Sequence, residues 1–196
     1  MDFLRRMQEL LNWTRKFDFL GPLALRIFLA PIFILAGMGK LSGIENTATW
    51  FGSLGIPAPL FMAYLAGLSE FIGGLLLIPG IAVRWAVVPL MISMAVAAGA
   101  VHWENGWHVL PEKELMMPWE WRPDLIDGAF ERRNMARKLL REHGNYEWLT
   151  ETGPITILKN GIEFAATYFI MLLSLFFTGA GRLSVDYVID RRLHST

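Results

Sequence analysis

The sequence contains no cysteine, and this absence excludes several kinds of chemistry at once. Disulfides, thiol nucleophiles, iron–sulfur clusters and cysteine-ligated zinc all need that side chain. The phosphate-binding motif of P-loop proteins and the dinucleotide-binding fingerprint are missing as well. No Ser, His and Asp set stands out as a catalytic triad. No histidine lies deep in an apolar segment, so the sequence offers no pair of axial ligands for a haem.

Charge is also scarce. Only 18% of the residues are charged and 54% are hydrophobic, whereas an average soluble domain has about 25% charged residues. The 18 basic and 18 acidic residues cancel, so we expect no nucleic-acid partner. A chain of 196 residues favours one domain. The composition therefore favours a single domain whose partner is the lipid bilayer.

Four long apolar segments approach the length of about 20 residues that a helix needs to cross the hydrocarbon core. They cover residues 20–41, 57–83, 85–102 and 161–181. Small residues within them favour close packing of helices in lipid. The glycines concerned are Gly37, Gly39, Gly73 and Gly74. We therefore predict an all-α polytopic membrane protein, a bundle of four transmembrane helices that occupies residues 1–196 as a single membrane domain.

Two segments lie outside these spans. Residues 1–18 have apolar side chains at helical spacing and none of the features of a cleavable signal, which predicts an amphipathic helix on the membrane surface or against the bundle. Residues 103–159 form a long extramembrane connection between the third and fourth spans. Within it we predict a helix over 124–143, capped by Asp124 and ended at Gly144.

Ionisable residues within the spans are costly, at about 2.5–3.5 kcal/mol for a charge at mid-bilayer. Glu70 lies midway through the second span, and Arg26 and Lys40 lie near the two ends of the first. One interpretation is an internal polar cluster that binds a ligand or moves a proton; the other is a salt bridge that sets helix register. For Lys40 and Glu163, at span ends, we expect the side chains to snorkel to the interface.

His102 ends the third span and is followed closely by Glu104 and His108. Two imidazoles and a carboxylate can ligate zinc, copper or iron, which makes these three residues weak metal candidates. Their spacing is not a strong metal signature, and an interfacial turn anchored by tryptophan explains them equally. We therefore predict no metal site. His102 alone is favoured as a proton-bearing group near the mouth of a pocket.

Several motifs occur in a familiar order and spacing. They are Leu25-Arg26-Ile27, Ala36-Gly37-Met38-Gly39-Lys40-Leu41, the run from Gly67 through Glu70 to Gly80, and the run from Thr178 to Asp186. On these residues the chain resembles the DoxX family of small bacterial membrane proteins. The resemblance covers roughly residues 20–110 and 155–190. The N-terminal helix lies outside it, and the 111–155 stretch is longer than the family pattern.

The resemblance implies a four-helix bundle in the bacterial inner membrane. Some members of the family are associated with quinone-linked oxidation of thiosulfate, others with oxidative-stress assemblies, and distant relatives act as chaperones or cargo receptors. Carried over to this sequence, the resemblance implies that Arg26, Lys40, Glu70 and His102 are functional. Four crossings place both termini on one side. The basic residues on the two sides are about equal in number, but those in the long connection count less, which favours the cytoplasm for both termini.

Three functional hypotheses follow. The first is a membrane subunit of a redox assembly, an oxidoreductase subunit not catalytic alone, which binds a quinone or another amphipathic molecule. Arg26, Lys40 and Glu70 would bind the ligand, and Glu70 and His102 would handle its protons. The second is a non-catalytic accessory subunit that docks a protein partner through residues 103–159, where tryptophans suit an interface. The third, a small transporter or channel, is weaker because no inverted repeat is evident.

Overall fold

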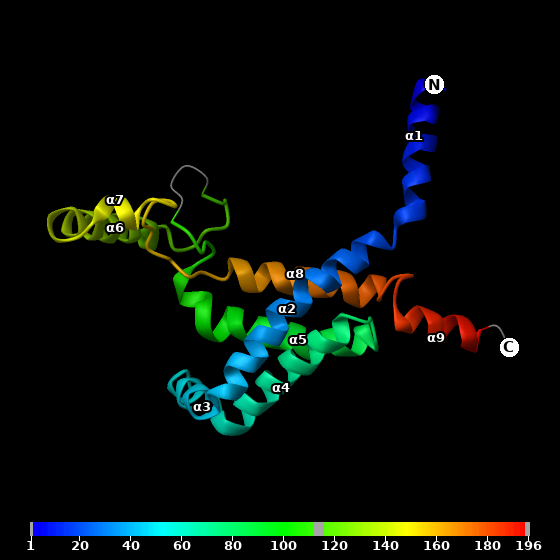
Figure 1. The fold of residues 1–196 in the computed structure, drawn as a ribbon, viewed down its shortest axis with the longest axis horizontal. Coiled ribbons are helices and arrows are strands. Elements are labelled where there is room, and N and C mark those ends of the chain that lie inside the picture. Colours follow the sequence, from blue (N-terminus) through cyan, green and yellow to red (C-terminus); the bar gives the residue numbers. More distant parts are fainter. Residues whose placement is uncertain (1, 112–115, 195–196) are drawn as a thin grey trace. The chain divides into compact units, whose positions relative to one another are not determined.

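The computed structural model describes residues 2–111 and 116–194, and within them it contains helices and no strands (Figure 1). The chain divides into two compact units, Met1–Ser93 with Tyr168–Thr196, and Met94–Thr167. The helices lying wholly or mainly in the first unit are α1 Asp2–Thr14, η1 Arg15–Phe17, α2 Leu20–Ser42, α3 Ile44–Ser53, α4 Pro59–Leu77, α5 Val83–Val96, α8 Glu163–Thr178 and α9 Val185–Leu193. The others are η2 Ala97–His102, η3 Trp103–Asn105, α6 Pro123–His143 and α7 Tyr146–Leu149.

Three helical segments in the described part of the chain are long and apolar enough to cross a membrane: Leu20–Ser42, Pro59–Leu77 and Val83–Asn105. Only 17–33% of their most apolar windows is buried inside the protein. Their remaining apolar side chains face outwards, which a bilayer explains and water does not. The prediction of a polytopic helical membrane protein is therefore confirmed, with three such helices.

The fourth predicted span corresponds to α8, which is shorter than expected. The helix has 16 residues, a length of about 24 Å at 1.5 Å per residue, against a hydrocarbon core of about 30 Å. The apolar segment predicted over 161–181 loses its last three residues because Gly179 and Gly181 adopt positive φ angles of 74° and 76°. Length alone therefore supports three crossings.

Glycine allows α2 and α4 to pack closely in the first unit. A Cβ atom added to Gly74 would lie 2.8 Å from the backbone N of Ile34, and one added to Gly37 would collide with the backbone of α4 at Gly67 and Phe71. Such contacts are typical of helices packed in lipid. The predicted role of these small residues is therefore confirmed at Gly37 and Gly74. Gly39, by contrast, faces open space.

The segment after α8 returns to the link between α4 and α5. The backbone N–H groups of Val185 and Asp186 donate to the carbonyl oxygens of Pro79 and Gly80, at 3.1 and 3.0 Å. The Asp186 carboxylate then accepts from the first backbone N–H groups of α5, at Ala82 (2.6 Å) and Val83 (2.9 Å). Asp186 therefore caps α5 from a distant part of the sequence, where a carboxylate is favoured by the helix dipole.

The N-terminal segment forms α1, as predicted. The described side chains of α1 are exposed along the whole helix, and they include large apolar ones such as Phe3, Leu4 and Leu10. A single helix cannot bury its own apolar side chains, so they need another apolar surface. Its exposed apolar residues suit the membrane surface better than water.

In the second unit, α6 begins one residue earlier than predicted and ends at the predicted Gly144. The predicted cap is wrong, because Pro123 occupies the first helical position and Arg122 is the N-cap. The Asp124 carboxylate instead accepts two hydrogen bonds from the Arg122 guanidinium, at 3.0 and 2.8 Å. This contact lowers the pKa of Asp124.

Candidate ligand site and the buried charges

Lys40 and Glu70 form an ion pair between α2 and α4. The Lys40 Nζ atom lies 2.6 Å from Glu70 Oε2, with 3% of the Glu70 side chain and 25% of the Lys40 side chain exposed. Lys40 therefore turns inwards, and the expectation that it snorkels to the interface is wrong. A buried carboxylate attracts the ammonium more strongly than it would in water, because the surroundings have a low dielectric.

Close packing of the α2 and α4 backbones positions the Lys40–Glu70 pair. Gly37 and Gly67 each lie three residues before a charged residue, and their helices touch at these glycines. Residues three apart share one face of a helix, so the same contact brings Lys40 and Glu70 together. A Cβ atom on Gly67 would lie 3.4 Å from Lys40 Cβ, which shows that the lysine stem runs along Gly67. Thr47 of α3 donates to the Lys40 carbonyl oxygen at 3.2 Å.

Arg26 is fully buried and has a different partner. Its Nη2 atom donates to the carbonyl oxygen of Leu183 at 2.6 Å. Its Nε and Nη1 atoms have no hydrogen-bond partner among the described residues. The guanidinium packs against Gly80, where any Cβ atom would strike Nη1 and where φ is +70°. Its coulombic partner is Asp186.

Arg26, Glu70 and His102 were predicted to form one cluster, and within the first unit Arg26 and Glu70 have different partners. Glu70 pairs with Lys40, and Arg26 holds the chain after α8. His102 belongs to the second unit, where its Nδ1 atom lies 3.0 Å from the Asn160 carbonyl oxygen. A carbonyl oxygen only accepts, so Nδ1 carries a proton and Nε2 is the ring atom left for exchange. The role of His102 stays a prediction.

Of the other two weak metal candidates, Glu104 accepts from Arg122 through its backbone carbonyl oxygen, and His108 has side-chain partners. His108 is buried, with Nδ1 at 2.7 Å from Glu120 Oε2 and Nε2 accepting from the Met117 backbone N–H at 3.2 Å. Both ring nitrogens of His108 are thus occupied by protein groups. Among the residues that the structure describes, no group of three or more His, Cys, Asp or Glu side chains is arranged to hold a metal ion.

A second buried carboxylate, Glu120, was not singled out from the sequence. It accepts from the Lys159 ammonium, the His108 ring and three backbone N–H groups, those of Trp107, His108 and Arg122. The Lys159 and Glu120 side chains are 1% and 0% exposed. The sequence carries a weak signal for them, since Glu120 stands between two tryptophans and Lys159 lies two residues before the fourth apolar segment.

The ionisation of Glu120 follows from these contacts. Burial opposes ionisation of the carboxyl, but the donors from Lys159, His108 and the backbone outweigh it and hold the pKa of Glu120 well below its ordinary value. Glu163 also contacts this segment, because its carboxylate accepts a hydrogen bond from the Val109 backbone N–H at 3.0 Å. Glu163 is thus engaged with the connecting segment rather than snorkelling alone.

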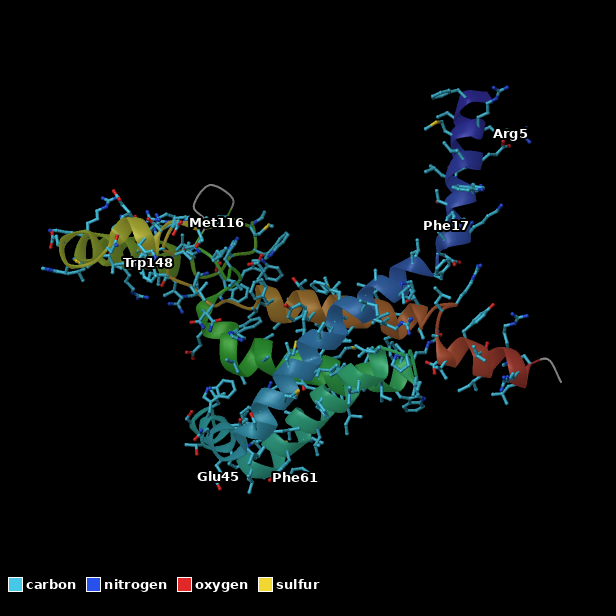
Figure 2. All side chains as sticks on the ribbon, viewed as in Figure 1. Arg5, Phe17, Glu45, Phe61, Met116 and Trp148 are labelled. Atoms are coloured by element: carbon cyan, nitrogen blue, oxygen red, sulfur yellow. The ribbon has the colours of Figure 1, made fainter. Side chains whose placement is uncertain are left out.

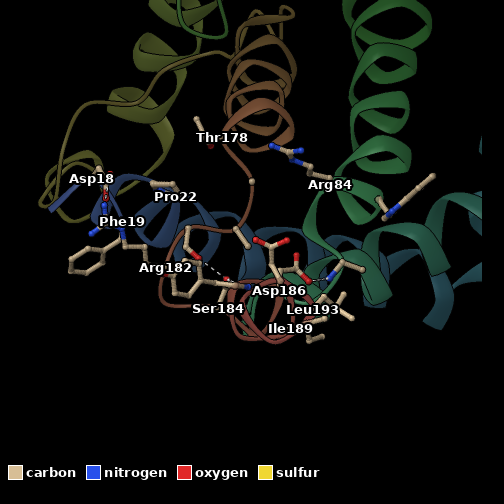
Figure 3. Close-up of a pocket in the computed structure, with 17 residues that line it drawn as sticks. Asp18, Phe19, Pro22, Arg84, Thr178, Arg182, Ser184, Asp186, Ile189 and Leu193 are labelled. Carbon is tan, nitrogen blue, oxygen red and sulfur yellow. Dashed lines mark hydrogen bonds and ion pairs between the residues drawn. The ribbon is translucent and has the colours of Figure 1, made fainter. Parts of the chain in front are cut away.

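The first unit also has a cavity of about 840 Å³, which was not anticipated from the sequence (Figure 3). It lies where α2 and α5 begin and α8 ends. Its wall includes charged side chains from three segments: Asp18 before α2, Arg84 in α5, and Arg182, Asp186 and Asp190 after α8.

These features define the class of the protein as a small polytopic helical membrane protein with an ion pair buried between two of its helices. Comparison with known proteins gives the family: the DoxX family model matches residues 21–103. The chain belongs to the DoxX family, as the sequence motifs predicted. No solved structure matches the chain.

Three curated relatives show the extent of the similarity. The Bacillus subtilis protein named "Putative oxidoreductase CatD" is 43% identical over 65 residues, covering 33% of this chain and 47% of that protein. The Escherichia coli inner membrane protein YqjF is 37% identical over 70 residues, covering 36% and 52%. The Escherichia coli inner membrane protein YphA is 32% identical over 101 residues, covering 48% and 72%. The chain spans about half the length of the first two.

Proposed function

We propose that the protein is a membrane subunit of a redox assembly that binds a quinone or another amphipathic small molecule at the Lys40–Glu70 pair. The observation that carries the proposal is a carboxylate buried inside a membrane helix with one side-chain donor, at 2.6 Å. Ionisable groups inside a membrane domain mark ligand or proton sites more often than surface charges do. A relative whose name includes "oxidoreductase" supports the redox setting.

The roles follow from the contacts of each residue. The Lys40 side chain is partly exposed, so its ammonium has donor positions available to a carbonyl oxygen of a ligand. Glu70 would orient Lys40 and exchange protons with a reduced ligand. Arg26 stays in the proposal as a ligand-binding residue because two of its nitrogens lack partners among the described residues. His102 stays as the proton carrier at the end of the third span.

The experiment is quinone retention by the protein in nanodiscs that contain ubiquinone or menaquinone, quantified by chromatography and mass spectrometry after washing. Glu70→Gln should reduce retention roughly tenfold or more, the change expected for one charge-assisted contact. Glu45→Gln, at an exposed glutamate of α3, is the matched control and should leave retention unchanged. Equal retention by wild type and Glu70→Gln in folded protein would overturn the assignment.

We also propose four crossings with both termini in the cytoplasm of a bacterium. The support is that Arg182, just after α8, forms an ion pair with Asp18, just before α2, at 3.1 Å. An even number of crossings returns the chain to its starting side.

Because the protein has no cysteine, Gln8→Cys and Glu151→Cys each create a single site for labelling. An impermeant maleimide added to intact spheroplasts should modify Glu151→Cys alone; modification of Gln8→Cys alone would reverse the orientation.

A second candidate function is a non-catalytic accessory subunit that docks a protein partner through residues 103–159. The observation that favours it is a group of tryptophans in this segment. Trp103 packs against Trp121 with ring centroids 4.8 Å apart, and Trp148 is 69% exposed. Exposed tryptophans are enriched at interface hot spots. Trp148→Ala should reduce co-purification of a crosslinked partner, whereas Trp85→Ala, at a tryptophan of the first unit that is 82% exposed, should not. Equal recovery from both variants would argue against docking.

A further inference from the structure

We propose that the cavity at the start of α2 and α5 binds the phosphate group of an anionic phospholipid, with Arg84 as its charged contact. The cavity belongs entirely to the first unit and has a volume of about 840 Å³. That volume lies within the range of pockets that enclose small ligands. The inference is separate from the quinone proposal, because none of the residues proposed to bind quinone lines this cavity.

Charge pairing leaves Arg84 as the unbalanced cation. Each carboxylate of the cavity wall has a donor: Arg182 lies 3.1 Å from Asp18, the backbone of α5 caps Asp186, and His194 lies 3.3 Å from Asp190. The Arg84 guanidinium donates to the Phe177 carbonyl oxygen at 3.1 Å and has no ion pair among the described residues. A neutral oxygen leaves the positive charge uncompensated.

The depth of the cavity suits a lipid headgroup. Two of the three helices long enough to cross a membrane, Leu20–Ser42 and Val83–Asn105, begin beside it. The headgroup layer lies where apolar helices end. Trp85, next to Arg84, is 82% exposed, and tryptophan is enriched at this level. The wall has three carboxylates and two guanidinium groups, so a phosphate would be attracted by Arg84 itself and not by a net positive wall.

The other walls suit the parts of a lipid next to its phosphate. Figure 3 shows Phe19 and Pro22 on one side of the cavity and Ile189 and Leu193 of α9 on another. These apolar side chains can contact the glycerol and the first acyl carbons. A Cβ atom at Gly179 would lie 3.5 Å from Arg84 Nε, an ordinary van der Waals distance. The guanidinium therefore lies against the turn after α8.

The test is native mass spectrometry of the full chain in detergent micelles titrated with phosphatidylglycerol. The wild-type protein should retain one lipid at activation energies that remove all others. Arg84→Gln should weaken this retention roughly tenfold or more. Arg191→Gln removes the same charge from α9 outside the cavity wall and should change it less than about twofold. Equal losses in both variants would show diffuse charge attraction and overturn the site.

Two further arms distinguish the source of the phosphate and cover a variant that fails to fold. Inorganic phosphate at millimolar concentration should leave the bound lipid in place; displacement would assign the site to soluble phosphate and overturn the proposal. A photoactivatable phosphatidylglycerol crosslinked to the wild-type protein should label peptides that contain residues 82–85 and 178–193. Labelling confined to other peptides would overturn the proposal without any variant.

Discussion

Glu70 and Glu120 are both buried carboxylates paired with a lysine, yet their surroundings differ. Glu120, in the second unit, accepts hydrogen bonds from two side chains and three backbone N–H groups. Glu70, in the first unit, has one side-chain donor among the residues that the structure describes, Lys40. A carboxylate has about four acceptor positions, so Glu120 is saturated and Glu70 retains capacity.

This difference is the reason for proposing a structural role for Glu120 and a functional role for Glu70. The donors to Glu120 join two segments that are far apart in sequence, one around His108 and one around Lys159. They occupy the acceptor positions of the carboxylate, so none is left for a ligand. The Glu70 carboxylate and the partly exposed Lys40 ammonium can still gain a partner. The predictions that follow test whether the two sites respond differently when a charge is removed.

The largest effect is expected from Glu120→Gln. The substitution leaves the Lys159 ammonium buried without a counter-charge, and breaking a buried pair in this way costs about 3–5 kcal/mol. Hydrogen exchange at the backbone N–H groups of His108 and Gly161 should show the loss of protection. Glu104→Gln, at an exposed position, is the control and should change little. A loss below about 1 kcal/mol would show that Glu120 is not structural.

Acid should have a similar effect on the second unit. Because the folded pKa of Glu120 is lowered, its contribution to stability is present above the unfolded pKa, about 4.3, and is lost as the pH falls below that value. The same amide protons should therefore exchange faster, after correction for intrinsic rates, as the pH drops below about 4. Glu120→Gln should remove much of this dependence.

An asymmetric effect is expected at the Lys40–Glu70 pair. Lys40→Gln leaves a nearly fully buried carboxylate alone and should cost about 2–4 kcal/mol, whereas Glu70→Gln leaves an ammonium that reaches water and should cost about half as much. The double variant should be more stable than the sum of the two losses predicts. Unfolding in mixed detergent micelles measures all three. Equal single losses and exact additivity would mean that the pair has no coupling.

A smaller effect is expected when the contact beneath this pair is disturbed. Gly37→Ala places a methyl group against the backbone of α4, and overpacking of this kind costs about 1–3 kcal/mol. Gly39→Ala, two residues along the same helix, meets nothing within 4 Å and should be neutral or slightly stabilising. The same unfolding assay compares them. Equal stability of the two variants would exclude close α2–α4 packing as the origin of the pair.

The sequence predicted what depends on local composition. Apolar length identified α2, α4 and α5, the motifs identified the family, and a glycine marked the end of α6. These features are set within a few turns of the chain, where periodicity and residue type decide the outcome. Arg26 and Glu70, singled out as ionisable residues within the spans, are among the least exposed polar side chains, whereas Lys40, expected to snorkel, turns inwards.

The sequence did not predict which buried charged residues contact one another. The sequence left the partner of Glu70 open and predicted that Lys40 snorkels, but backbone packing at Gly37 and Gly67 brings Lys40 to Glu70. Asp186 and Glu120 gain their roles from contacts more than 100 and up to 39 residues away. Such contacts depend on the three-dimensional path of the chain, which residue type and spacing do not encode.

The smallest effect is expected at the exposed Asp18–Arg182 pair, whose side chains are more than half exposed. Arg182→Gln should cost about 0–1 kcal/mol, because water screens the interaction and ordering two side chains costs entropy. The loss should disappear at about 1 M salt, where the screening length is about 3 Å, while the loss in Lys40→Gln persists because that pair is buried. Unfolding in mixed micelles at low and high salt makes the comparison. If Arg182→Gln lowered the free energy of unfolding by more than about 1.5 kcal/mol at both salt concentrations, the pair would behave as a buried structural ion pair and not as an exposed one.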